Sequence, residues 1–329
     1  MTVLKAVPLL LWLAALTLVG WILSQLPLAT ITQTISTLSP AQWFAWFGLN
    51  LAIILLATQR WWVITQLLKL PVRFGELLMM RQAGQAVSFI TPGPQFGGEP
   101  LQIFWLWKRS KLPIHSALLA LGLDRFYELW INFSVLLFSV ALLLAALASQ
   151  DVVWQNVLVG LALILLTLTL LGWLILKQPK RVLFWLKKVT VYWHHHPRLQ
   201  HLETHWQHLG SDLQRAIKEQ KPALFLAFIL SLLGWGGLIA ELWLLLSFFD
   251  LALDFSDFMV ILVAMRLAFL LPLPGGLGTL EASLFWAFQY LSLPTSAVLG
   301  LIALMRLRDV LVLLVGLWCL RVMQLRESH

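Results

Sequence analysis

The sequence predicts an all-α polytopic membrane protein with about six transmembrane helices and two re-entrant broken helical hairpins, arranged as an inverted-topology repeat. Three observations predict this fold. Of the 329 residues, 60% are hydrophobic and only 12% are charged, whereas a soluble domain is nearer half apolar and a quarter charged. Several apolar runs reach the ~20 residues that a transmembrane helix needs. Two further apolar stretches are each interrupted by proline and glycine in a similar pattern.

The composition excludes a chain built only of soluble globular domains, because the surplus apolar surface has to face lipid. The chain has a single cysteine, Cys319, inside an apolar run. A lone cysteine excludes an intrachain disulfide and a cysteine-based metal site. The excess of positive charge first suggests cytoplasmic loops of a membrane protein, and we expect no nucleic-acid partner.

Six apolar runs are long enough to cross a bilayer. They cover about 4–24, 43–68, 113–149, 153–176, 222–249 and 296–320. The first run could instead be a signal peptide. However, it has one early cation and no clear cleavage pattern of small residues, so an uncleaved first helix is favoured.

The cations orient the chain in the membrane. Eighteen of the 23 lysines and arginines lie near the termini, between the second and third runs, or between the fourth and fifth. The loops 25–42, 150–152 and 250–257 hold no cation. Because cytoplasmic loops collect lysine and arginine, we expect an integral, multi-pass protein of the plasma (inner) membrane with both termini in the cytoplasm.

The two interrupted stretches, 75–108 and 258–292, resemble each other. Each contains Phe-x-x-Pro-x-Pro, then a pair of glycines, then a glutamate, and the two proline pairs are 180 residues apart. Their halves are too short to cross a membrane alone, so we expect two re-entrant hairpins. The alternative is two kinked full spans, which would leave one cationic loop outside. The interrupting residues are Pro92, Pro94, Gly97, Gly98, Pro272, Pro274, Gly275, Gly276 and Gly278.

With both hairpins included, the order is span, span, hairpin, span, and the same order again upside down. We therefore expect a first repeat over 1–150 and a second over 151–329, as in transporters built from inverted repeats. Backbone breaks inside a membrane are tolerated only where protein or water satisfies the freed N–H and C=O groups. The second half-helix of each hairpin would point its positive N-terminal end at the membrane centre, where two such ends favour an anion.

Ionisable residues lie inside the predicted membrane segments, where each charge costs ~3 kcal/mol. Arginines beside two positive helix ends favour a phosphate-bearing ligand. The candidate substrate-binding residues are Arg125, Arg266, Arg306, Arg308, Glu99, Glu281, Asp124 and Asp309.

Two other interpretations of these charges remain open. They are internal ion pairs that join helices, for example Asp309 with Arg306, or Glu99 and Glu281 cap their half-helices. Arg60 lies near a cytoplasmic end of its run, where we expect it to snorkel to the membrane surface.

The segment 177–221 carries nine of the cations and six of the eight histidines. Apolar residues recur every three to four positions from Leu199 to Ile217, which favours an amphipathic helix on an anionic leaflet. A metal held by His201, His205 and His208 is the alternative. We expect neither a metal nor another cofactor, because the chain has no Walker loop, dinucleotide fingerprint or nucleophile elbow.

One motif resembles a known family. Pro272-Leu-Pro274-Gly275-Gly276-Leu-Gly278-Thr-Leu-Glu281 resembles the Pro-x-Pro-Gly-Gly-x-Gly-x-x-Glu motif of the lysylphosphatidylglycerol synthase transmembrane-region family, the flippase-like integral membrane proteins. Gly98-Glu99, then Lys108-Arg109, then Asp124-Arg125 with Glu128, is similar to that family's first block. The resemblance covers essentially the whole chain. It implies a stand-alone membrane domain without the soluble synthase domain, and so movement of lipid and not its synthesis.

We therefore expect a transporter that moves an anionic, phosphate-bearing lipid or a polyprenyl-phosphate-linked lipid between leaflets, and no enzymatic activity. The head group would sit between the hairpins, and Glu99 and Glu281 would line its path. Two alternatives belong to other classes. One is an intramembrane enzyme that acts on a lipid phosphate; the other is a non-transporting scaffold that recruits partners through 177–221.

Overall fold

The computed structural model describes residues 36, 38–91, 97–108, 114–146, 152–177, 220–271 and 273–325. The regular elements in these residues are all helices, and these residues contain no strand. The elements are α3 (Pro40–Leu67), α4 (Phe74–Ile90), α5 (Glu99–Lys108), α6 (Ile114–Ala146), α7 (Val152–Lys177), α10 (Lys221–Ser247), α11 (Phe255–Ala268), the 3-10 turn η2 (Pro274–Gly276), α12 (Thr279–Tyr290) and α13 (Thr295–Leu325). The predicted run 4–24 and nearly all of the segment 177–221 lie outside the described residues.

Four of the described helices, α3, α6, α7 and α10, are long and apolar enough to cross a membrane. The last predicted run is also a single helix, the 31-residue α13, but it carries charged residues near its middle. Large apolar side chains are exposed on the outer faces, for example Leu163 on α7 and Trp318 on α13. Such a surface would be an aggregation liability in water and suits lipid. The chain is thus a membrane protein with several apolar helices.

Local sequence signals explain where the helices begin. At the start of α3, the Ser39 hydroxyl accepts a hydrogen bond from the Gln42 N–H, and the Gln42 side chain accepts one from the Ser39 N–H. This reciprocal pair is a capping box, and Pro40 fits the first helical position because no N–H is needed there. At the start of α11, the Asp254 N–H donates to the Asp257 carboxylate at 3.3 Å.

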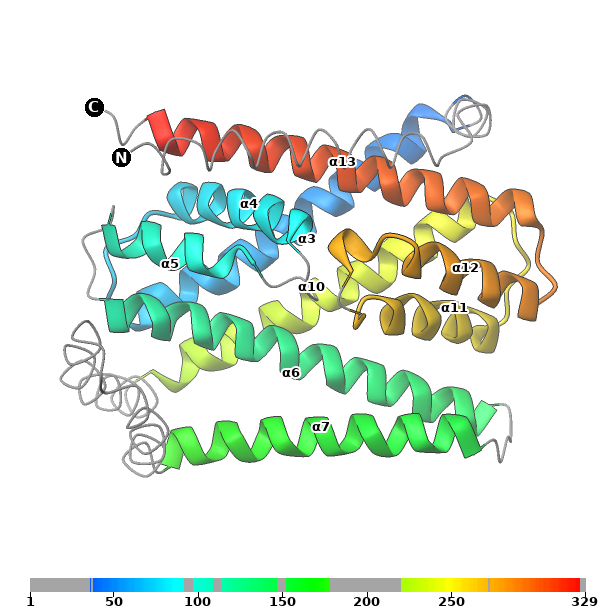
Figure 1. The fold of residues 1–329 in the computed structure, drawn as a ribbon, viewed down its shortest axis with the longest axis horizontal. Coiled ribbons are helices and arrows are strands. Elements are labelled where there is room, and N and C mark those ends of the chain that lie inside the picture. The colour runs from blue at the N-terminus through cyan, green and yellow to red at the C-terminus, as the bar shows by residue number, and fades with distance from the viewer. Residues whose placement is uncertain are drawn as a thin grey trace.

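Both interrupted stretches form two separate helices, so neither is a kinked continuous helix. In Figure 1, α4 and α5 run in from one end of the molecule and back, while α11 and α12 do the same from the opposite end. The second turn needs glycine, because Gly275, Gly276 and Gly278 have φ values of 56°, 62° and 79°, a region that other residues rarely adopt. Three of the predicted interrupting residues, Pro92, Pro94 and Pro272, lie outside the described residues.

Helix packing brings the end of α4 against the turn between α11 and α12. Helix α3 packs on α10, α4 on α13, and α11 on α6, while α7 packs on the outside of α6. Close approach explains two glycines: a Cβ at Gly316 of α13 would lie 2.6 Å from the Ala86 Cβ of α4, and one at Gly275 would lie 2.5 Å from the Phe89 ring. The end of α4 therefore touches the turn of the other helical pair.

Candidate functional site

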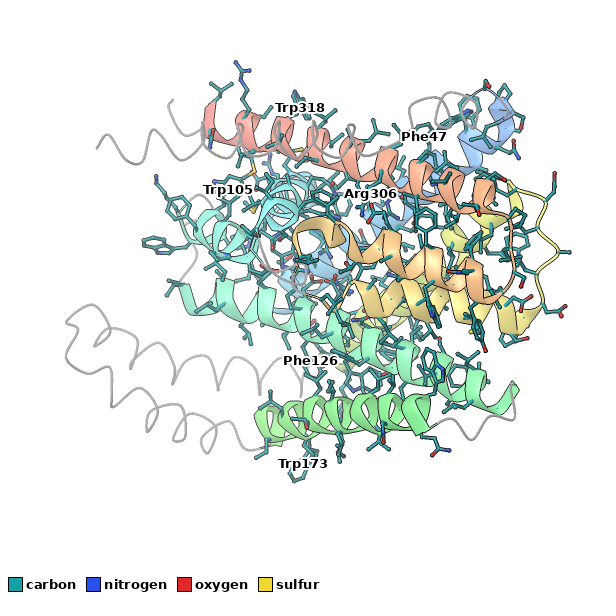
Figure 2. The ribbon with its side chains drawn as sticks, turned by 45° about the vertical axis from the view of Figure 1, so that its right-hand side comes forward. Phe47, Trp105, Phe126, Trp173, Arg306 and Trp318 are labelled. Atoms are coloured by element: carbon teal, nitrogen blue, oxygen red, sulfur yellow. The ribbon has the colours of Figure 1, made fainter. Side chains whose placement is uncertain are left out.

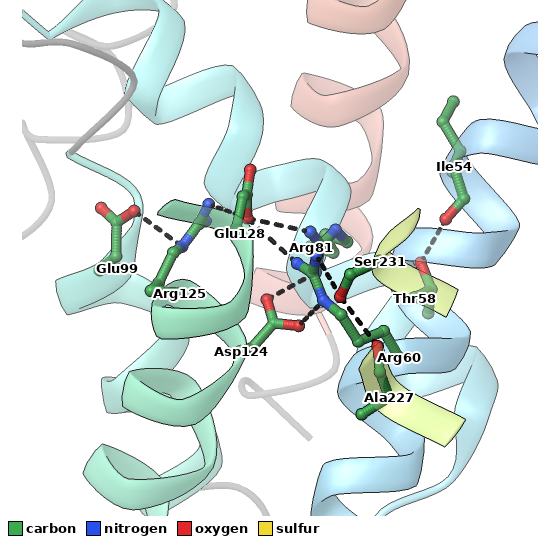
Figure 3. A network of polar contacts seen from close by, with 10 residues as sticks. All are labelled: Ile54, Thr58, Arg60, Arg81, Glu99, Asp124, Arg125, Glu128, Ala227 and Ser231. Atoms are coloured by element: carbon green, nitrogen blue, oxygen red, sulfur yellow. Dashed lines mark hydrogen bonds and ion pairs between the residues drawn. The ribbon is translucent and has the colours of Figure 1, made fainter. Parts of the chain in front are cut away.

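A first cluster of charges joins three helices at the centre of the molecule (Figure 3). Asp124 on α6 accepts from Arg60 Nε of α3 at 2.7 Å and from Arg81 Nη1 of α4 at 3.0 Å. Arg60 Nη2 also donates to Glu128, one turn further along α6, at 3.1 Å. Because the Asp124 side chain has no solvent exposure, these two arginines are what makes its burial tolerable.

The same cluster reaches the first turn of α5. Arg125 lies 2.9 Å from Glu128 and 3.1 Å from Glu99, the residue that begins α5. The other oxygen of Glu99 accepts from the Gly97 N–H at 2.7 Å, and the Gly98 N–H donates to the Ser88 hydroxyl of α4 at 2.8 Å. Glu99 therefore caps its own helix and ties that helix to α6.

A second cluster holds the turn between α11 and α12. Arg306 on α13 reaches Glu281 of α12 at 2.7 Å and Asp309, one turn along α13, at 2.9 Å. It also donates to the carbonyl oxygens of Gly275 and Gly276 at 3.0 and 3.3 Å. Its side chain is only 1% exposed, and Figure 2 shows it in the middle of the molecule. Arg306 thus satisfies the carbonyls that the turn frees from helical bonding.

The second cluster extends to α3 and α10. Arg308 Nη1 donates to Glu241 of α10 at 2.7 Å, and Arg308 Nη2 donates to Asp309 at 3.1 Å. The other oxygen of Glu241 accepts from the Trp46 indole and the Asn50 amide of α3, at 3.3 and 3.0 Å. Every charge in this part of the cluster is paired, as buried charges require.

The two clusters use the same device at the start of the second helix of each pair. Glu281 accepts from the Gly278 N–H at 2.9 Å while it binds Arg306, just as Glu99 accepts from Gly97 while it binds Arg125. The positive ends of α5 and α12, which the sequence suggested as anion sites, are therefore already occupied by the chain's own carboxylates. These glutamates cap half-helices and form interhelical ion pairs at once.

Arg266 differs from the other predicted arginines. It lies in the last turn of α11 and stacks over the Trp235 ring of α10, with its guanidinium carbon 4.6 Å from the ring centroid. Its Nε is enclosed without a hydrogen-bond partner. Within the part of the chain that the structure describes, Arg266 forms no ion pair.

All the sequence-based candidates except Arg266 thus fall into two groups. Glu99, Asp124 and Arg125 belong to the first cluster; Glu281, Arg306, Arg308 and Asp309 belong to the second. The predicted ion pair between Arg306 and Asp309 is present.

Two arginines lie elsewhere than the sequence suggested. Arg60 does not snorkel: it is 4% exposed and paired with Asp124, because α3 crosses the molecule beside α6. Arg81, one of the cations between the second and third apolar runs, lies within α4 and is buried against the same carboxylate. The local sequence around Arg60 and Arg81 gives no signal of these long-range partners.

A metal site was considered for the histidines of the segment 177–221. The described residues contain no group of three or more histidine, cysteine or acidic side chains that could hold a metal ion. His201, His205 and His208 lie outside the described residues.

Comparisons with known proteins agree on a membrane family. The family model described as the lysylphosphatidylglycerol synthase TM region matches residues 6–316. A UPF0104 membrane protein of Methanothermobacter thermautotrophicus is 22% identical over 250 residues, which are 74% of this chain and 73% of that protein. No solved structure matches the chain significantly.

Proposed function

The chain belongs to the lysylphosphatidylglycerol synthase transmembrane-region family, and from that premise we propose that it moves an anionic lipid between the two leaflets of the plasma membrane. The lipid carries a phosphate, either in a phospholipid head group or in a polyprenyl-phosphate link. One observation carries the proposal: the end of α4 contacts the turn between α11 and α12, with one cluster of charges beside α4 (Figure 3) and the other, around Arg306, beside that turn (Figure 2). Charges at such a depth mark a path for a polar cargo.

The architecture that we propose for lipid transport is an inverted-topology repeat with two re-entrant hairpins. The spacing of corresponding helices along the chain supports this repeat. The first residues of α3 and α10, Pro40 and Lys221, are 181 positions apart; those of α4 and α11, α5 and α12, and α6 and α13 are 181, 180 and 181 apart. The cross-packing is reciprocal as well, since α4 of one half contacts α13 of the other and α11 contacts α6. Transporters of this plan bind cargo where discontinuous helices meet.

The remaining topology follows from this repeat. Counting the run 4–24 and α13, six helices span the bilayer, both termini face the cytoplasm, and each hairpin enters from one side and returns to it. The basic segment 177–221 lies on the anionic cytoplasmic leaflet. The division into 1–150 and 151–329 separates the two repeats.

The cargo is met first by the side chains of Arg125 and Glu99, which are 21% and 16% exposed. The two atoms of their 3.1 Å contact, Arg125 Nε and a Glu99 carboxylate oxygen, are enclosed, and the contact lacks hydrogen-bond geometry. A phosphate that displaces Glu99 from Arg125 gains a charge-assisted bond. Arg306, by contrast, is enclosed, so its part is to hold the second turn while one repeat rocks against the other. No covalent step is involved.

The experiment is a head-group translocation assay. The protein is reconstituted in liposomes that contain fluorescently labelled phosphatidylglycerol, and dithionite quenching reports how fast inner-leaflet label reaches the outside. We expect the wild-type protein to exchange the label faster than protein-free liposomes do. Arg125→Gln should exchange it about tenfold more slowly than wild type, because the variant loses one charge-assisted bond. Arg321→Gln, at the exposed end of α13, is the matched control and should exchange like wild type. Exchange no faster than in protein-free liposomes contradicts the proposal.

A further inference from the structure

Arg266 stands out because the five arginines of the two clusters, Arg60, Arg81, Arg125, Arg306 and Arg308, each bind at least one carboxylate. Among the described residues, Arg266 donates no hydrogen bond, and its Nε is enclosed and unpaired. A guanidinium stays charged in a protein. An unpaired charge in an apolar environment is strongly unfavourable, so this position can accept an anion that the described residues do not supply.

The geometry of the pair leaves the right atoms available. Arg266 lies over the face of the Trp235 ring, an arrangement that stabilises a cation through the ring quadrupole. All five N–H groups of a guanidinium lie in its plane. Because Nε is enclosed and the two terminal nitrogens are not, the terminal edge is the part that an incoming anion can reach.

The surroundings fix the place of this arginine. Trp235 is buried in α10, which contacts α11, so the ring anchors the guanidinium. Arg266 itself lies three residues before Phe269, where α11 ends at the central turn. The pair is therefore anchored and close to the proposed path.

We propose that Arg266, stacked on Trp235, binds the phosphodiester anion of a phospholipid head group through its two terminal nitrogens. Two parallel N–H groups match two non-bridging phosphate oxygens, which is the bidentate geometry that favours arginine over lysine. This inference deepens the proposed function and rests on it for the lipid nature of the ligand. Arg306 and Arg308 hold the turn and the helices in place; Arg266 holds the cargo.

The competing account is structural: Trp235, the negative C-terminal end of α11 and the electrostatic attraction of the Glu241 carboxylate satisfy Arg266. The two accounts differ for Arg266→Gln. If Arg266 binds an external anion, replacing it leaves the melting temperature of the free protein unchanged or raises it, and weakens ligand binding. If it is structural, removing it lowers the melting temperature and leaves the affinity of the folded protein unchanged.

The test is calorimetric titration of the full chain in detergent. The probes are dihexanoyl phosphatidylglycerol, its deacylated head group glycerophosphoglycerol, and the phosphate-free dihexanoylglycerol. The variants are Arg266→Gln, Arg266→Lys and Trp235→Leu. Lys108→Gln is the matched control, because Lys108 is also a cation over an aromatic ring, 5.2 Å from the Phe104 centroid, but at the far end of α5.

We expect the phosphatidylglycerol probe to bind wild type and Lys108→Gln with equal affinity. It should bind Arg266→Gln about 10- to 100-fold more weakly, because the variant loses hydrogen bonds to a charged group. Arg266→Lys should be intermediate, because it keeps the charge without the fork. Trp235→Leu should also weaken binding. Equal affinity in Arg266→Gln and wild type, or equal binding of dihexanoylglycerol, overturns the inference. Arg266-dependent binding of glycerophosphoglycerol as strong as that of the lipid supports the phosphodiester site and rejects the lipid source.

The failure of this inference and that of the proposed function are distinguishable. Lipid exchange in proteoliposomes that is unchanged by Arg266→Gln refutes the site and leaves transport standing. Arg266-dependent binding without any lipid exchange refutes transport and leaves the site standing.

Discussion

Replacing Arg306 by glutamine should destabilise the protein by about 3–5 kcal/mol, the usual consequence of removing one partner from a buried ion pair. The magnitude follows from its contacts. The side chain is enclosed and binds Glu281 at 2.7 Å, Asp309 at 2.9 Å and the Gly275 carbonyl at 3.0 Å. Its loss leaves two carboxylates facing each other and frees carbonyls at a turn that water does not readily solvate.

The assay is thermal unfolding in detergent, followed by size-exclusion chromatography of the heated samples. A change of this size corresponds to a decrease in melting temperature on the order of 10 °C. The double variant Arg306→Gln/Glu281→Gln removes the stranded carboxylate as well, so it should be more stable than the sum of the two single variants predicts. Arg321→Gln is the control. A melting temperature for Arg306→Gln within 2–3 °C of wild type, roughly 1 kcal/mol, would refute the structural part assigned to this arginine.

Three further changes follow from the packing. Gly98→Val should destabilise by about 3 kcal/mol, because a Cβ there would overlap the backbone of Gly84; thermal unfolding measures this, and a neutral result would contradict the close approach of α5 to α4. Arg60→Met should lower the stability by about 3–5 kcal/mol, since Asp124 then keeps only Arg81; a snorkelling arginine would show almost no effect. Trp318→Leu, at an exposed position on α13, should change the stability by no more than about 0.5 kcal/mol.

Most of the helix positions could be predicted from the sequence, because a membrane helix is recognisable as a long run of apolar residues. The predicted runs 43–68 and 153–176 correspond to α3 and α7 within a few residues. The interrupted stretches were recognisable because proline and glycine cannot continue a helix. Their division into α4 with α5, and α11 with α12, confirms the breaks. The six spans and the re-entrant repeat remain predictions.

The site could be predicted only in part. The sequence placed the acidic and basic residues of both clusters inside membrane segments and suggested the ion pair of Arg306 with Asp309, which is present. The pairs of Glu99 with Arg125 and of Glu281 with Arg306 were not predicted. Arg60 could not be assigned either, since its partner Asp124 is 64 positions away. Partners at such separations depend on how helices cross, which the local pattern does not encode.

The measurement that tests the central claim most directly is lipid exchange in a protein whose α4 is reversibly joined to the turn between α11 and α12. The tip of the Phe89 ring of α4 contacts Gly275 in the turn between α11 and α12, so Phe89→Cys and Gly275→Cys, in a Cys319→Ala background, place two thiols on either side of the contact, farther apart than a direct disulfide spans. A short bis-methanethiosulfonate linker can join them. With cross-linking verified by mass spectrometry, the linker should stop the exchange of labelled phosphatidylglycerol and dithiothreitol should restore it, because the head group passes where α4 and the turn separate. Each single-cysteine variant should be insensitive to the linker. Equal exchange by the cross-linked and the reduced protein would contradict transport between α4 and this turn.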